Sequence, residues 1–130
     1  MPQMNTNVPV LDALSNRIVG GPITVSNALG IGFLERIYEN ALAIELREAG
    51  LAVTQQHGIT VTYRDRIIGD YAADLLVEGA VLVELKTARA LDRTHHAQCI
   101  NYLRATGLRL CLLINFGTPR LEFRRVVLDL

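Results

Sequence analysis

The apolar residues of this 130-residue chain change their spacing at Gly50, and this change limits the folds open to it. Ahead of Gly50 they recur at positions 34, 37, 38, 41, 42, 44 and 46, which is the spacing of one helix face. From residue 51 onward apolar and polar residues alternate, which predicts strands. A helical segment followed by a run of strands is typical of a mixed α/β or α+β fold.

The second part of the chain is predicted to consist of strands with one helical interruption. Strands are expected over residues 51–56, 59–64, 67–77, 81–86, 108–116 and 121–128. The segment 92–107 has the pattern of a helix, with Asp92 or Thr94 as its N-cap and Gly107 as its stop.

The first part of the chain is predicted to form two helical pieces, over residues 10–21 and 22–30. Pro22 should break or kink them, because it has no N–H to donate and its ring crowds the preceding turn. Residues 1–9 are expected to be disordered and residues 10–130 to form a single domain, since a chain of this length with half of its residues apolar can bury one core.

The stretch DLLVEGAVLVELK, residues 74–86, places two carboxylates and an ammonium in otherwise apolar strands. A hairpin with a three-residue loop would set Asp74 opposite Glu84, with Lys86 beside Glu84 on the same face. A two-residue loop would instead pair Asp74 with Leu85. Gly79 favours the longer loop, because that loop needs a residue at positive φ.

Two opposed carboxylates repel each other, so a positive charge must lie near them. Asp74 and Glu84 together have the chemistry of a divalent-metal site, since Mg²⁺ prefers carboxylate and water oxygens. The alternative is a structural ion-pair cluster on a half-exposed sheet face. Lys86 is the one lysine among 13 basic residues, which marks a position where arginine does not serve, because a lysine is a compact charge whose pKa shifts readily.

Two predicted helices add polar candidates to the hairpin. Glu35 borders an apolar helix stripe close to the helix N-terminus, where the helix dipole favours a carboxylate. Gln98 and Tyr102 lie four residues apart on the later helix, with His95 one turn earlier. Their amide and phenol could position a phosphate or a water; the alternative is an ordinary amphipathic helix boundary.

The segment from Gly32 to Tyr38 reads G-x-x-E-x-x-Y, and the chain resembles the GxxExxY protein family of the PD-(D/E)XK nuclease-like superfamily. The resemblance extends from about residue 14 to residue 128 and includes LGIGFLERIYENAL, YAADLLVEGAVLVELK, AQCINYLRATG and LLINFG. It implies a restriction-endonuclease-like α-β-β-β-α-β core, with a central mixed sheet flanked by helices. It also implies hydrolysis of phosphodiesters with Mg²⁺ or Mn²⁺.

The resemblance assigns the metal ligands position by position. Asp74 matches the aspartate of the motif, Glu84 and Lys86 match its E-x-K, and Glu35 matches the acid of the first helix. The implied metal ligands are Asp74, Glu84 and the Leu85 carbonyl, with Glu35 holding metal or water.

The remaining roles also follow from the resemblance. Lys86 would orient the attacking water. Gln98 and Tyr102 match a Q-x-x-x-Y motif and would place the phosphate or brace Lys86. Ala73 stands where the motif has proline, a tolerable departure.

The expected function is therefore a Mg²⁺-dependent nuclease that acts on DNA or RNA. One alternative is an inactive nucleic-acid- or protein-binding module with the same fold, which the zero net charge favours. Another is a structural dimerisation domain whose charges merely pair. The expected location is the cytoplasm, with Cys99 and Cys111 as free thiols, no membrane contact, and a homodimer or a partner protein as further options.

Overall fold

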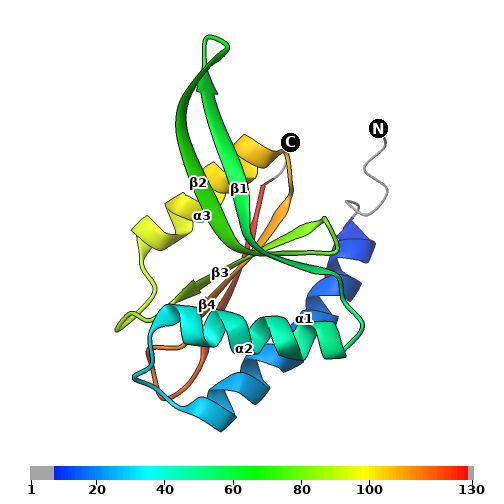
Figure 1. Ribbon diagram of the computed structural model, residues 1–130, viewed down its shortest axis with the longest axis vertical. Coiled ribbons are helices and arrows are strands. Elements are labelled where there is room, and N and C mark those ends of the chain that lie inside the picture. The colour runs from blue at the N-terminus through cyan, green and yellow to red at the C-terminus, as the bar shows by residue number, and fades with distance from the viewer. Residues whose placement is uncertain (1–7, 129–130) are drawn as a thin grey trace.

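The structure is a computed structural model that describes residues 8–128 (Figure 1). Three helices and five strands follow in the order α1 (Val8–Leu29), α2 (Glu35–Glu48), β1 (Val53–Tyr63), β2 (Arg66–Val77), β3 (Val81–Lys86), α3 (Arg93–Thr106), β4 (Leu110–Asn115) and β5 (Glu122–Val127). The five strands form one sheet in sequence order. Only β3 and β4 are parallel, with α3 as their crossover; the other neighbours are antiparallel. The predicted mixed sheet flanked by helices is confirmed.

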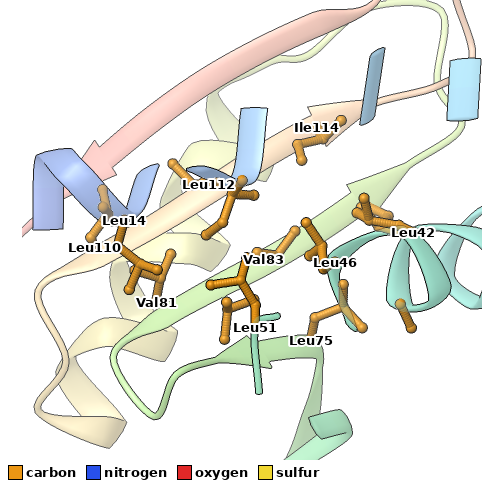
Figure 2. Packing of buried hydrophobic residues seen from close by; sticks show 14 of the residues in the cluster. Leu14, Leu42, Leu46, Leu51, Leu75, Val81, Val83, Leu110, Leu112 and Ile114 are labelled. Atoms are coloured by element: carbon orange, nitrogen blue, oxygen red, sulfur yellow. The ribbon is translucent and has the colours of Figure 1, made fainter. Parts of the chain in front are cut away.

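Two apolar layers cover the two faces of the sheet. On one face, α1 and α2 pack against alternate residues of β2, β3 and β4, as the labelled side chains of Figure 2 show. On the other face, α3 packs through Cys99, Tyr102 and Leu103. Every residue of β4 is buried, and so is every residue of β3 except the last, Lys86, which is partly exposed. Both strands are covered because a layer of helices lies on each face of the sheet. The end of β3 is thus the place where a central strand comes out to the surface.

Helix α1 corrects the sequence prediction of two helical pieces. It runs without interruption through Pro22, which is buried inside it. A Cβ atom added to Gly21 would lie 3.0 Å from side-chain carbons of both Leu42 and Leu46, so the glycine allows α1 to lie directly on α2. This packing offsets the hydrogen bond that Pro22 cannot donate. Helix α1 also begins at Val8, two residues before the predicted start of the domain; residues 1–7 of the predicted disordered segment lie outside the described residues.

The predicted strands 51–56 and 59–64 are one strand, β1, with an irregularity at Gln56. Gln56 has φ 54° and is not paired with a residue of β2. Its two neighbours are paired, Gln55 with Leu75 and His57 with Ala73. The β1–β2 hairpin continues well beyond the rest of the sheet as a two-stranded arm (Figure 1).

The segment that follows β3 is held by the buried amide of Asn115. Its Oδ1 accepts hydrogen bonds from the backbone N–H groups of Ala88 (3.0 Å) and Gly117 (2.9 Å), and its Nδ2 donates to the Ala88 carbonyl (2.9 Å) and to Glu122 (2.8 Å). These bonds fix the chain directly after Lys86.

Among the described helices, none has the combination of length and apolar character that a membrane crossing requires.

Candidate functional site

The β2–β3 hairpin has the predicted three-residue loop. Val77 pairs with Val81, and the ladder continues through Leu75 and Val83. Glu78 and Gly79 take positive φ values of 54° and 65°, as a tight loop of this length needs. The register therefore brings the next residues of the two strands, Asp74 and Glu84, opposite each other.

At Asp74 and Glu84 the side chains replace the regular ladder. The Leu85 N–H donates to Asp74 Oδ2 at 2.7 Å, and the Asp74 N–H donates to Glu84 Oε1 at 3.2 Å. Each carboxylate is therefore fixed by the backbone of the opposite strand. The two acids lie together at the point where the strands separate.

Burial makes this pair of acids electrostatically unfavourable. Glu84 is 4% exposed; burial, and then the charge of Asp74, raise its pKa to about 9. Burial also raises the pKa of Asp74, against the lowering effect of the Leu85 N–H. At neutral pH the pair therefore holds a proton unless a cation binds, and a cation would take the place of that proton.

Lys86 lies next to the two acids and binds a side chain of α3. Its Nζ donates to Gln98 Oε1 at 2.8 Å, and Gln98 Nε2 donates to the Tyr102 hydroxyl at 3.1 Å. Burial, and next the charge of Glu84, raise the pKa of Tyr102 to about 12, so the phenol keeps its proton. Lys86 is thus held by an amide which is itself held by a phenol.

The predicted start and stop of α3 are confirmed, and they give His95 a structural role. Asp92 is the N-cap: its Oδ1 accepts from the backbone N–H groups of Thr94 and His95, while the Asp92 N–H donates to His95 Nδ1 at 3.1 Å. Gly107 ends the helix at φ 75°. His95 therefore caps the helix that positions Gln98.

Glu35, the first residue of α2, joins the site from the other face of the sheet. Burial, and then the charge of Asp74, raise its pKa, while the charge of Lys86 lowers it, so Glu35 lies within electrostatic reach of both. Tyr38 holds the turn before it: its hydroxyl donates to the Gly30 carbonyl (2.6 Å) and accepts from the Phe33 N–H (3.2 Å). The tyrosine of the G-x-x-E-x-x-Y segment is thus a structural residue that positions its glutamate.

Two residues of this cluster were not predicted. Glu39, 2% exposed, accepts from Gln56 Nε2 at 2.6 Å, and the same nitrogen lies 3.4 Å from Asp74 Oδ1. Glu39 stands four residues after Glu35, a spacing that could have revealed it. Gln56 carries no such signal, because its contacts with Glu39 and Asp74 join residues 17 and 18 positions away in the chain.

The donor set fits a hexacoordinate Mg²⁺ or Mn²⁺ ion that completes its shell with waters. It does not fit an ion held by protein side chains alone. Over residues 8–128, no three His, Cys, Asp or Glu side chains are grouped so as to hold a metal. Mg²⁺, however, uses only one or two carboxylates and completes its shell with waters and substrate phosphates. Asp74 and Glu84, with the Leu85 backbone beside them, supply that number.

The chain is similar to a known protein family and to a solved structure. A family model described as the PD-(D/E)XK nuclease superfamily matches residues 12–126. No curated protein matches the chain. Among solved structures, the one titled "Crystal structure of SSO0001" is similar, with a TM-score of 0.57 and 16% identity over 73% of this chain. The chain spans 50% of the length of that protein chain, and the likeness shows a shared fold.

Proposed function

Since the chain belongs to the PD-(D/E)XK nuclease superfamily, we propose that it is a divalent-metal-dependent nuclease that hydrolyses phosphodiester bonds of DNA or RNA. The observation that carries this proposal is the pairing of Asp74 with Glu84 at the open end of the hairpin, with Lys86 held beside them by Gln98. The narrower resemblance to the GxxExxY family stays a prediction.

Asp74, Glu84 and the Leu85 carbonyl would hold the ion. A bound Mg²⁺ or Mn²⁺ supplies a Lewis acid that polarises the phosphate and lowers the pKa of a water. Binding of the ion would displace the proton that Glu84 holds at neutral pH, because the folded protein raises the pKa of Glu84 to about 9. Glu35, within reach of the charge of Asp74, would hold a further water or the ion itself.

The other residues act on the water and the phosphate. Lys86 is held at one point by Gln98, so its ammonium keeps one position from which it can orient the attacking water. The Tyr102 hydroxyl accepts from Gln98 and retains its own proton, which it can donate to a phosphate oxygen. An arginine would carry the charge at position 86 but is larger and planar, which agrees with the single lysine of the chain standing there.

A zero net charge gives the chain little long-range attraction for nucleic acid. A homodimer or a partner protein that adds phosphate contacts therefore belongs to this proposal. The buried thiols of Cys99 and Cys111 fit the reducing cytoplasm, where such cysteines stay free.

The test is cleavage of labelled single-stranded DNA, duplex DNA and RNA with millimolar Mg²⁺ or Mn²⁺. Asp74→Asn, Glu84→Gln and Lys86→Arg should each lower the rate by about 100-fold or more, as removal of one charge-stabilising group does in other enzymes. Glu48→Gln is the matched control, because Glu48 is exposed at the far end of α2. EDTA should abolish cleavage by the wild type.

Two outcomes would contradict the proposal. Cleavage by the three variants at the wild-type rate would move the reaction away from this site. Binding of nucleic acid by the wild type without any cleavage, with either metal, would establish the inactive binding module instead.

A further inference from the structure

A hollow adjoins the candidate site. It has a volume of about 660 Å³ and lies between α3 and the outer part of the β1–β2 arm. In Figure 1 the arm extends past the sheet on the side where α3 lies. Gln98 and Tyr102 are among its lining residues, so the hollow shares a wall with the residues that hold Lys86. A ligand in this hollow would therefore continue directly from a phosphate bound at the hairpin acids.

We propose that this hollow binds an unpaired nucleotide of the substrate, so that the enzyme acts on single-stranded nucleic acid. The inference rests on the proposed nuclease function and adds the substrate class. Tyr71 and Tyr102 form an aromatic wall, with ring centroids 5.6 Å apart and planes tilted by 45°. Tyr71 is 54% exposed, so a base can stack on the part of its ring that Tyr102 does not cover.

The rest of the lining suits a sugar and a phosphate. Thr60, Thr62 and Asn101 bring hydroxyl and amide groups that can donate and accept hydrogen bonds. The charged residue of the lining is Arg104, and the lining has no carboxylate. The hollow is thus locally suited to an anion although the chain as a whole has zero net charge.

The aromatic wall selects an unpaired base over a duplex. Within a duplex, both faces of each base are covered by its neighbours, and a side chain can stack only on a base that has left the stack. Leaving the stack costs least in a single strand. A base held on Tyr71 would place the adjoining phosphate toward Gln98, at the edge of the site.

The test is binding in EDTA, where no cleavage occurs, measured by anisotropy with a fluorescent oligonucleotide as a single strand and as a blunt duplex. The wild type should bind the single strand at least about tenfold more tightly. Tyr71→Ala should weaken binding of the single strand about tenfold, and Tyr71→Phe, which keeps the ring, should restore it. Arg104→Gln should weaken binding and lower the slope of log affinity against log salt by about 0.7.

The chain offers matched controls. Tyr63 lies on the same arm and is 60% exposed, but it does not line the hollow, so Tyr63→Ala should bind as the wild type does. Arg124→Gln removes an exposed arginine from β5 and should leave the salt slope unchanged. Equal losses for Tyr63→Ala and Tyr71→Ala would overturn the assignment to the hollow, as would tighter binding of the duplex or no binding of the single strand.

The two proposals fail separately. Asp74→Asn should bind the single strand as tightly as the wild type while losing cleavage. If Tyr71→Ala binds like the wild type but Asp74→Asn has lost cleavage, the site is a nuclease and this inference is wrong. If Tyr71→Ala has lost binding but Asp74→Asn still cleaves, the hollow holds the strand and the assignment of the reaction to the hairpin acids is wrong.

Discussion

Replacing Glu84 by glutamine should stabilise the metal-free protein, and the gain should grow with pH. Glutamine has the shape of the protonated glutamic acid. Its Oε1 can still accept the Asp74 N–H, and its Nε2 can donate to the Asp74 carboxylate, which lies beside it. The substitution thus keeps the hydrogen bonds and removes the group whose ionisation the folded state opposes.

The magnitude follows from the pKa of Glu84. In the folded protein this pKa is about 9, against an ordinary value of 4.5, so between these limits the folded state keeps a proton that the unfolded chain loses. The favourable contribution is complete below pH 4.5 and is lost as the pH rises toward 9. The loss is about 1.4 kcal/mol per pH unit, or about 3 kcal/mol between pH 4.5 and pH 7. The glutamine side chain of Glu84→Gln does not titrate, so the stability of the variant does not fall with pH for this reason.

The assay is urea unfolding of the wild type and Glu84→Gln in EDTA at pH 5, 6, 7 and 8, followed by circular dichroism. The difference in free energy of unfolding should increase in favour of the variant with each pH step. Glu48→Gln, which removes an exposed carboxylate from the same chain, is the control for the loss of a carboxylate as such.

A variant that is less stable than the wild type at every pH would refute this reasoning. That outcome would mean that the ionised Glu84 is a paired structural brace, as the ion-pair alternative holds. A difference that stays constant between pH 5 and pH 8 would also refute it, because the folded state would then not hold the proton on Glu84.

Three further predictions concern metal binding and the turns around the site. Mn²⁺ at millimolar concentration should raise the melting temperature of the wild type but not of Asp74→Asn, since a ligand that binds only the folded state stabilises it; equal shifts would place the ion elsewhere. Tyr38→Phe should cost about 1–3 kcal/mol in urea unfolding, because it removes two hydrogen bonds of the hydroxyl, one to the Gly30 carbonyl and one from the Phe33 N–H, and each contributes about 0.5–1.5 kcal/mol; an unchanged midpoint would deny the turn this role. Gly117→Ala should cost about 1–3 kcal/mol, because its Cβ would collide with the backbone of Ala88; a melting temperature equal to the wild type would show that this segment yields.

Much of the sheet could be predicted from local patterns alone. Alternation located the strands, and Gly79 selected the loop length that sets Asp74 opposite Glu84. Asp92 and Gly107 marked the ends of α3, because capping depends on residues within one turn of the helix end. These features are local, so a single stretch of sequence contains the residues that decide them.

Other features depend on contacts between distant residues. Helix α1 continues through Pro22 because Gly21 meets the side chains of α2, and no local rule contains that contact. Gln56 takes a positive φ and reaches Glu39, 17 residues away, so the buried Glu39 became part of the cluster only in three dimensions.

The chemistry of the site divides in the same way. The sequence by itself determined which groups are present: two acids and the one lysine at the end of a hairpin. Only the tertiary structure decided their protonation, because the pKa of Glu84 depends on burial under α3 and on the charge of Asp74 on the opposite strand. Burial is a property of the packed layers as a whole, and a charge acts through space on whatever the fold brings near it.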